Sequence, residues 1–182
     1  NGNSYSAPGW SGNILVGSNS NNTLNGSNGA DLILGLGGND KIDGKSGDDV
    51  LCGGDGVDLL QGMGGNDFLD GGKGSDVLNG GSGDYDELLG GEGNDTLLDG
   101  DGVRNASAGA GNDLLTIVLR KGWRDINGQA RFTGLTAGYG NDLVGLAIRD
   151  SAQFYIDISG DERDNPASSL EGTNDGLGLA GV

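Results

Sequence analysis

Eight aspartates recur at an almost constant interval in the first half of the chain. The step is nine residues, except for one step of ten between Asp76 and Asp86. A carboxylate is a hard oxygen ligand of the kind that Ca²⁺ prefers, because this ion takes about six to eight oxygens from carboxylates and carbonyls. The recurrence therefore predicts a series of calcium ligands at position six of a repeat, namely Asp31, Asp40, Asp49, Asp58, Asp67, Asp76, Asp86 and Asp95.

These aspartates belong to a nine-residue repeat, Gly-Gly-x-Gly-x-Asp-x-Leu-x, of which residues 53–61 and 71–79 are full copies. The glycines permit a tight turn, since glycine reaches positive φ without steric cost. Side chains alternate between faces along a strand, so x-Leu-x predicts a three-residue strand with only its centre facing inward. That central position is apolar in every copy: Leu24, Ile33, Ile42, Leu51, Leu60, Leu69, Leu78, Leu88, Leu97, Ala106 and Leu115.

One turn and one short strand form half a coil, so two copies, about eighteen residues, complete one turn of a flattened solenoid. We expect two sheets that face each other across a thin layer of Leu and Ile. The tenth residue of the irregular step is placed near Tyr85. A weaker copy has Asn22 at position six, a broken copy has Arg104 there, and the register returns at Asp113.

Stacking pairs each copy with the copy two places later, so position-six carboxylates would lie about 4.8 Å apart and repel one another without a metal ion. One ion between each acidic pair gives about seven sites. Arg104 either replaces an ion with its own charge or only marks a decayed repeat. For Asn22 and Asp142, turn shaping is as plausible as metal binding. The expected pairs are Asp31/Asp49, Asp49/Asp67, Asp67/Asp86, Asp40/Asp58, Asp58/Asp76, Asp76/Asp95 and Asp95/Asp113.

Composition narrows the choice of metal and of partner. Zn²⁺ prefers nitrogen and sulfur ligands, whereas the chain has no His and one Cys, and Mg²⁺ demands stricter octahedral geometry. The single Cys52 is at position nine and should point away from the core. A net charge of −17 argues against nucleic-acid binding. No stretch is long enough to span a membrane. With 41 glycines and low hydrophobicity, we expect disorder without calcium and folding with it.

The charge is uneven along the chain, which indicates a second region. Residues 1–102 contain 17 acidic and 3 basic residues, whereas residues 103–182 contain 10 and 7. Longer apolar segments at 114–119, 143–148 and 154–158 predict longer strands in a wider-coil cap, which an open solenoid end requires. We therefore divide the chain into a leading linker (1–12), a calcium-binding roll (13–116) and a β capping region continuous with it (117–182).

Residues 26–98 closely resemble the repeats-in-toxin (RTX) family, and the resemblance extends more weakly over 17–116. It implies an all-β, right-handed parallel β-roll with Ca²⁺ held between stacked turns by position-six carboxylates, Asp113 included, and by turn carbonyls. It also implies a secreted or cell-surface protein, exported by bacterial type I secretion. The glycines that we take as carbonyl ligands are Gly54, Gly56, Gly65, Gly72, Gly74, Gly81, Gly83, Gly91 and Gly93.

No nucleophile–base pair or Zn²⁺ ligand set is evident, so we expect no enzymatic activity. The favoured function is a calcium-folded structural module of an adhesin, surface layer or filament. The alternative is an accessory or polysaccharide-binding module of an extracellular enzyme such as an alginate epimerase, protease or lipase. Arg120, Lys121, Trp123 and Arg124 form a basic and aromatic group that either contacts an anionic glycan or a neighbouring subunit, or is only a solvated loop.

Overall fold

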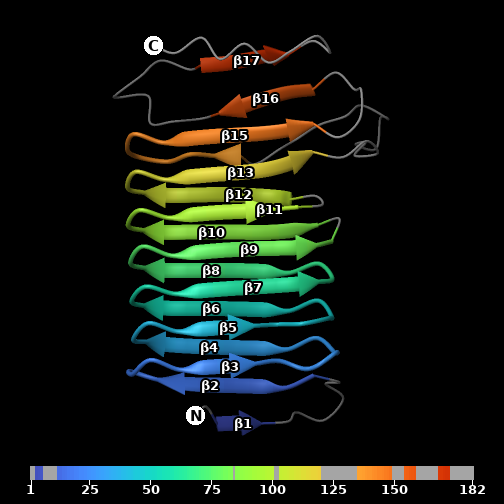
Figure 1. The fold of residues 1–182 in the computed structure, drawn as a ribbon, viewed down its shortest axis with the longest axis vertical. Coiled ribbons are helices and arrows are strands. Elements are labelled where there is room, and N and C mark those ends of the chain that lie inside the picture. The colour runs from blue at the N-terminus through green and yellow to red at the C-terminus, as the bar shows by residue number, and fades with distance from the viewer. Residues whose placement is uncertain are drawn as a thin grey trace.

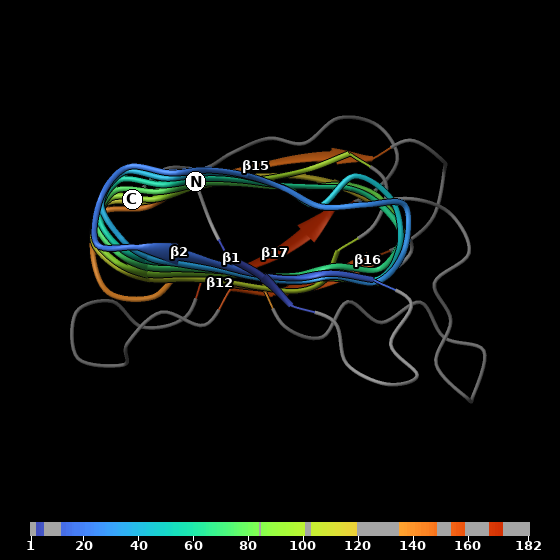
Figure 2. The same cartoon turned by 90° about the horizontal axis from the view of Figure 1, so that it is seen from below.

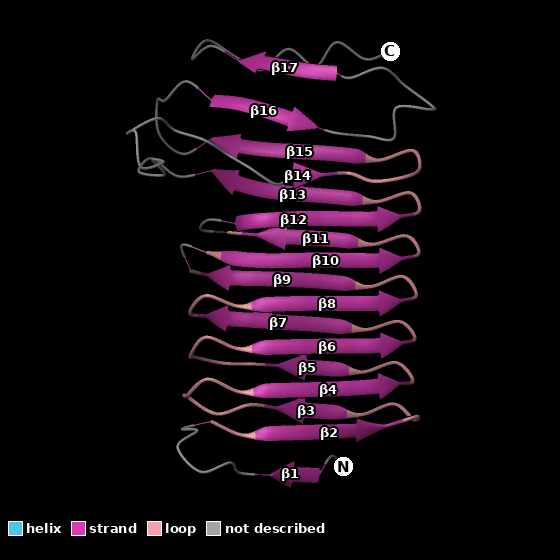
Figure 3. Cartoon of the chain, turned by 180° about the vertical axis from the view of Figure 1, so that it is seen from behind, coloured by secondary structure: helices cyan, strands magenta, loops and turns pink. Residues whose placement is uncertain are grey.

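The chain forms an elongated stack of strands whose turns lie along two opposite edges (Figures 1 and 3). This computed structural model describes residues 3–5, 12–83, 85–100, 103–119, 135–148, 154–158 and 168–172. Strands are the regular elements throughout this part of the chain, as the repeat predicts. No helix in the described ranges could span a membrane.

Two parallel sheets form the body of the stack, and the chain alternates between them. Among the described residues the first sheet has eight strands, in the order β1 (Asn3–Tyr5), β2 (Ile14–Ser18), β4 (Leu32–Gly37), β6 (Val50–Asp55), β8 (Phe68–Lys73), β10 (Asp86–Glu92), β12 (Val103–Ala110) and β14 (Leu135–Thr136). The second has seven, in the order β15 (Leu143–Ile148), β13 (Leu114–Leu119), β11 (Thr96–Asp99), β9 (Val77–Ser82), β7 (Leu59–Gly64), β5 (Lys41–Asp43) and β3 (Thr23–Asn25).

Two short strand pairs differ from this parallel arrangement. β1 pairs antiparallel with β2 at the N-terminal end of the first sheet. β16 (Phe154–Ile158) and β17 (Ser168–Gly172) form a separate antiparallel pair. The observed bounds of β13, β15 and β16 coincide with the long strands expected from the sequence.

The coil repeats every eighteen residues, so equivalent positions of successive coils lie side by side. Leu51 pairs with Ile33 on one side and with Leu69 on the other. Viewed along the stack, the two sheets form the long sides of a flattened ring and the turns form its ends (Figure 2). The predicted parallel β-roll is therefore confirmed.

The extra residue of the ten-residue step lies where the sequence indicates. Gly83 still stacks on Gly65, eighteen residues earlier. A Cβ atom built on Gly83 would lie 2.0 Å from the carbonyl oxygen of Gly65. Glu87 instead pairs with Phe68, nineteen residues earlier. The added residue is thus accommodated between Gly83 and Glu87, in the turn that contains the exposed Tyr85.

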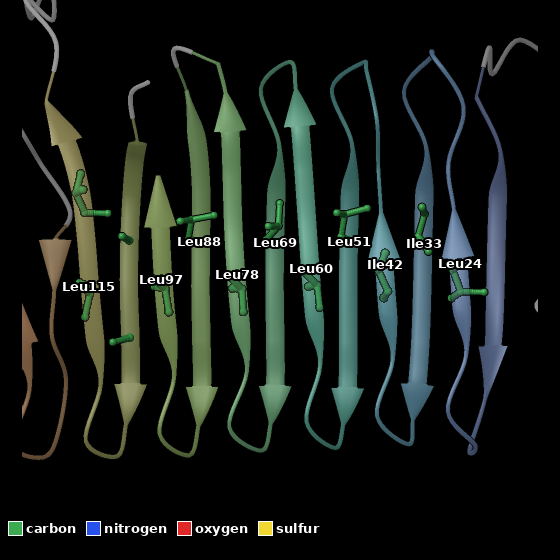
Figure 4. Packing of buried hydrophobic residues seen from close by; sticks show 13 residues of the cluster. Leu24, Ile33, Ile42, Leu51, Leu60, Leu69, Leu78, Leu88, Leu97 and Leu115 are labelled. Atoms are coloured by element: carbon green, nitrogen blue, oxygen red, sulfur yellow. The ribbon is translucent and has the colours of Figure 1, made fainter. Parts of the chain in front are cut away.

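The core is a thin layer made mainly of position-eight side chains, to which Ala108 and Ile117 are added at position one of later coils. Leu24 is 2% exposed, and Ile33, Ile42, Leu51, Leu60, Leu69, Leu78, Leu88, Leu97, Ala106 and Leu115 are fully buried. Side chains from the two sheets alternate along the stack (Figure 4). Their outward neighbours, such as Leu59 and Cys52, are only half-buried, which confirms the predicted inward and outward faces.

The expectation of three-residue strands is wrong for most coils. Among the described coils of the nonapeptide array, β3 and β5 have three residues, whereas β6 to β9 each have six. The glycines at positions one and two continue the ladder, as the pairing of Gly54 with Gly72 shows. Because alternation continues, position one also faces inward, and Gly53 is buried as Leu51 is. The sequence predicted a turn for the glycines at positions one and two. A residue pattern does not reveal that their backbone still pairs with the neighbouring coils.

Position two adopts a left-handed backbone, with φ between 99° and 110° at Gly54, Gly72 and Gly91. Leu36, Lys45 and Met63 occupy the same position at φ of 78°, 76° and 74°. An L side chain is strained in this region. The stack therefore imposes this conformation even where the sequence departs from glycine.

The coil widens after β13, in agreement with the predicted cap. β15 pairs with β13 in parallel register, Leu143 with Leu114, so this step takes twenty-nine residues in place of eighteen. The added residues fall in the connection from β13 to β14, which contains Arg120, Lys121, Trp123 and Arg124. These four residues lie outside the described part of the chain.

Candidate metal centre

Position-six aspartates of stacked coils contact one another through a backbone donor and a side-chain acceptor. The Asp31 N–H donates to Oδ1 of Asp49 at 2.7 Å, and the Asp49 N–H donates to Oδ1 of Asp67 at 2.9 Å. The same bond joins all the other expected pairs, Asp67/Asp86, Asp40/Asp58, Asp58/Asp76, Asp76/Asp95 and Asp95/Asp113, at 2.7–2.8 Å. The structure thus brings together the seven pairs that the sequence predicts.

The second carboxylate oxygen of most of these aspartates is buried without a hydrogen-bond donor. The residues are at most 3% exposed. A buried charged oxygen without a partner is costly, and native proteins normally compensate it with donors or cations. The orphaned atoms are Oδ2 of Asp40, Asp49, Asp58, Asp67, Asp76, Asp95 and Asp113.

Six of these seven orphaned oxygens face the position-one glycine of their own coil and a carbonyl of the next, whereas the coil of Asp113 has Ala108 at position one. A methyl group on Gly53 would lie 2.4 Å from Oδ2 of Asp58 and 2.7 Å from the carbonyl oxygen of Gly71. On Gly62 it would lie 2.3 Å from Oδ2 of Asp67 and 2.6 Å from the carbonyl of Gly80. Glycine at position one therefore keeps open a space lined by a carboxylate and a carbonyl oxygen.

Further carbonyls line the turn from the lower coil. The carbonyl oxygens of Gly54 and Gly56 point at the Cα atoms of Gly72 and Gly74, where a side chain would come within 2.3 Å and 1.6 Å of them. Among the described residues, no three acidic, His or Cys side chains converge on one point. A cation here would therefore complete its shell with main-chain oxygens, which suits Ca²⁺ and excludes a zinc-type ligand set.

Burial disfavours the ionised form of these carboxylates in the absence of a cation. Desolvation raises the pKa of Asp49 to about 7, although the Asp31 N–H opposes the shift, and the neighbouring Asp67 and Asp31 charges add to it. Desolvation likewise raises the pKa values of Asp67, Asp76 and Asp95 to about 6. A divalent ion would offset this desolvation, because it supplies positive charge beside the buried oxygens and so favours the ionised carboxylates.

The position-six residues stack in two rows, one along each edge of the roll. Near the N-terminal end of each row, a serine of the same coil donates hydrogen bonds to the position-six side chain. The Ser27 N–H and hydroxyl both donate to the Asp31 carboxylate, and Ser18 contacts Asn22 in the same way. The Lys45 ammonium group donates to the carbonyl of Gly26 at 2.7 Å. Asn22 thus has the position-six geometry, but its amide brings no charge.

Asp142 stacks next to Asp113 in the structure. The sequence had left the role of Asp142 open. The Asp113 N–H donates to Oδ1 of Asp142 at 2.9 Å. The spacing of twenty-nine residues concealed the relation, and the only signal was the shared Gly-Asn-Asp-Leu segment.

Sequence reasoning missed three further features. Position-five side chains form a second ladder, in which the Asn39 N–H donates to Oδ1 of Asn21 and the Asn112 N–H to Oδ1 of Asn94. Position-one carbonyls, rather than only those at positions two and four, face the carboxylates. Asp99 replaces glycine at position one and is 3% exposed. The acidic residue in a glycine position was a visible signal.

At Arg104, position six of the broken copy, the structure describes the backbone alone. Val103 pairs with Asp86 and Asn105 with Glu87, so the register shifts at Arg104. The Arg104 side chain lies outside the described residues, and its proposed replacement of a metal ion stays a prediction. Cys52 is a free, half-buried thiol.

Comparison with known families finds one match. The model for the RTX calcium-binding nonapeptide repeat (4 copies) matches residues 16–51, 53–85 and 86–115, together more than half of the chain. Searches of curated proteins and of solved structures find no match.

Proposed function

We propose, from the premise that this chain belongs to the family of RTX calcium-binding nonapeptide repeats, that it is a calcium-folded structural module of a secreted or cell-surface protein. The repeats bind Ca²⁺, and the fold is a structural β-roll. The finer elements of the proposal are the number of ions, about seven, and the residues that hold them.

The observation that carries the proposal is the row of orphaned carboxylate oxygens. Seven buried aspartates each have an Oδ2 without a donor, and in six of them this oxygen lies beside a carbonyl of the next coil. Bound Ca²⁺ supplies the positive charge that offsets their desolvation and mutual repulsion. The position-six carboxylates and the carbonyls of Gly54, Gly56, Gly65, Gly72, Gly74, Gly81, Gly83, Gly91 and Gly93 would hold the ions.

The roll couples this binding to folding because each site is shared by two coils. Neither coil alone supplies both the lower carboxylate and the upper carbonyl, so the unfolded chain has no preformed site. Binding only the folded state stabilises it by RT ln(1 + [L]/Kd), about 2.7 kcal/mol per site at a hundredfold excess of calcium. Several such sites are comparable with the total stability of a small domain, about 5–15 kcal/mol.

Circular dichroism in calcium and in chelator tests the coupling. We expect strong β signal in millimolar calcium, its loss on chelation and its return when calcium is restored. Magnesium at equal concentration is the matched control and should not restore it, because Mg²⁺ dehydrates reluctantly. A β signal that survives complete calcium removal at neutral pH would refute calcium-driven folding.

A secreted or surface location follows from the affinity expected of such sites. Extracellular calcium modules work at dissociation constants of about 10⁻⁴–10⁻³ M, far above cytosolic free calcium. The chain would then be exported unfolded and fold outside, for which type I secretion is the proposed route. Expression in a host with that export system, with the protein assayed in medium and cytosol, tests the location.

A second candidate is a polysaccharide-binding accessory module. The insertion between β13 and β14 contains Arg120, Lys121, Trp123 and Arg124, a concentration of positive charge on a chain of net charge −17. Retention on alginate that falls with salt, and is lost when the three cations become Ala, would favour it, because exposed charges are screened over about 8 Å at physiological salt. A neutral glucan is the control. If alginate does not retain the protein, the structural-module proposal stands and the accessory-module candidate fails.

A further inference from the structure

We propose that the outer face of the first sheet is an interface through which two copies of this chain pair once the roll has folded. The strands of this face, β2 to β12 in even numbers, lie on one long side of the flattened ring, away from the turns that hold the proposed calcium sites (Figure 2). The interface rests on the proposed calcium folding, and it adds a partner and the surface that binds it.

Three rows of outward-facing positions run along this face. In β6, Val50, Cys52 and Gly54 are partly exposed at positions seven, nine and two. The intervening Leu51 and Gly53 are buried. The parallel register repeats this alternation along the sheet, so each of the three positions forms a row with one residue from each strand.

The N-terminal part of this face is apolar. Partly exposed apolar side chains follow one another without interruption from β2 to β6 at position nine and from β2 to β8 at position seven. They are Val16, Leu34 and Cys52 at position nine, and Ile14, Leu32, Val50 and Phe68 at position seven. Leu36 joins them at position two and is 48% exposed. A contiguous apolar patch of this kind is typical of a binding surface.

The roll itself does not require an apolar outer face. The second sheet has the same parallel stacking and the same Leu core, yet its outward residues at position nine are polar. They are Asn25, Asp43, Gln61 and Asn79. The apolar character of the first sheet is therefore a property of this sequence and not of the fold.

The three rows are complementary to a second copy of themselves. Position seven has large side chains, whereas position two is glycine in β6, β8 and β10, at Gly54, Gly72 and Gly91. Position nine lies midway between them. A two-fold axis along the stack above position nine reverses the strand direction of the second copy, so position seven of one copy lies over position two of the other. Phe68 then packs over the glycine of β8, and Val50 over the glycine of β6. Such isologous pairing is the commonest form of oligomer.

The charges of the chain agree with this partner. In β2, β4 and β6 no charged residue occupies the three outward positions, so the contact needs no opposite charge from its partner. The net charge of −17 opposes association of two copies. About seven Ca²⁺ ions reduce it to about −3, so calcium removes most of this repulsion as it folds the face. Asp70 in β8 is the charged residue of the position-nine row, where it lies opposite its own equivalent and weakens the contact.

The area of the face indicates a weak, reversible dimer. Strands about 4.8 Å apart that rise about 3.3 Å per residue give six strands of five residues a face of about 29 Å by 16 Å. Two copies therefore cover roughly 900 Å² in projection, which is at the low end of specific interfaces. We expect a dissociation constant on the order of 10⁻⁵–10⁻⁴ M.

Sedimentation equilibrium of the full chain in millimolar calcium, from micromolar to near-millimolar protein, tests the interface. We expect the wild type to change reversibly from monomer to dimer. Leu34→Glu places a charge opposite its own equivalent and should weaken the dimer at least tenfold. Gln61→Glu is the matched control, because it places the same charge at position nine of the second sheet, and it should leave the dimer unchanged. Asp70→Leu removes the like-charged pair and should strengthen the dimer at least tenfold. Circular dichroism in calcium shows that each variant is folded.

The single cysteine of the chain reports on the axis. Cys52 is a free thiol in the position-nine row, so the thiols of the two copies face each other across the two-fold axis. A short bis-maleimide should cross-link the wild type in calcium and fail to cross-link Leu34→Glu at the same concentration. Equal cross-linking of both would mean that the thiols meet only by random collision.

A folded wild type that stays monomeric at near-millimolar concentration would overturn the interface and leave the calcium-folded roll intact. Equal weakening by Leu34→Glu and Gln61→Glu, or no strengthening by Asp70→Leu, would also overturn it, because the contact would then lie elsewhere. A wild-type chain that gains no β signal in calcium would instead overturn the proposed function itself.

Discussion

The backbone N–H of Asp49 donates to Oδ1 of Asp67 at 2.9 Å, while Oδ2 of Asp67 is buried without a donor. One carboxylate therefore has two tasks. Its first oxygen sets the register between stacked coils, and its second is left for a cation. At Asp58 and Asp76, too, Oδ1 accepts a backbone hydrogen bond from the neighbouring coil and Oδ2 has no donor. Register and metal binding therefore depend on the same side chains.

Asp67→Ala should cost more calcium than Asp142→Ala. Asp67 stacks on both Asp49 and Asp86, whereas Asp142 has a described position-six partner only in Asp113. We expect Asp67→Ala to lose about two ions and Asp142→Ala at most one, at about 2.7 kcal/mol of stability per site in hundredfold calcium excess. Isothermal titration gives the stoichiometry. Equal losses would contradict the sharing of each aspartate between two sites.

Gly62→Ala should destabilise the calcium-loaded roll by several kcal/mol. Its methyl group would lie 2.3 Å from Oδ2 of Asp67 and 2.6 Å from the Gly80 carbonyl, so an oxygen of the site must move. Gly64→Ala is the matched control, because the nearest atom to its methyl group is Ser82 Oγ at 3.5 Å. Thermal unfolding in saturating calcium compares them. Similar midpoints for the two variants would show that position one is not part of the site.

Leu60→Asp should prevent folding even in excess calcium. Leu60 is fully buried in the single core layer, and an unpaired carboxylate there has no compensating partner. Leu59→Asp places the same charge one residue earlier on the half-buried outer face and should retain the β signal. Circular dichroism of the two variants distinguishes the faces. If both fold or both fail, the assignment of inward and outward positions does not hold in solution.

Acidification should partly replace calcium. The folded-state pKa values of Asp67, Asp76 and Asp95 are raised to about 6 and that of Asp49 to about 7, from a reference of 3.8, chiefly by desolvation. A raised pKa means that the folded state binds more protons. The stability of the calcium-free fold is therefore greatest below the unfolded pKa and is lost as pH rises through about 6–7.

In chelator, the β signal should thus be stronger near pH 5 than at about pH 8. Asp67→Asn mimics one protonated carboxylate, so it should shift this transition to higher pH while it lowers the calcium count. A chelated chain with the same weak signal at both pH values would mean that carboxylate repulsion is not what unfolds it.

Much of this structure could be read from the chain itself. A strict period with glycine, aspartate and leucine at constant offsets determines which atoms repeat, and so it predicted the parallel roll, the Leu core and the seven stacked pairs. Leu60 and Asp67 could be placed because every coil repeats the same local geometry. The extra residue near Tyr85 was also visible, since it interrupts an otherwise constant step.

Other features depended on contacts between coils that no local pattern encodes. The strands extend through positions one to three because neighbouring coils supply hydrogen-bond partners for their glycines. The serine closure of Asp31 arises where the rows begin, and repetition gives no information about an end. Asp142 meets Asp113 across twenty-nine residues, where periodicity no longer indicates the partner. The sequence by itself determined the repeating unit and its chemistry, whereas the tertiary structure decided where the stack begins and how it crosses its interruption, because only stacking brings those residues together.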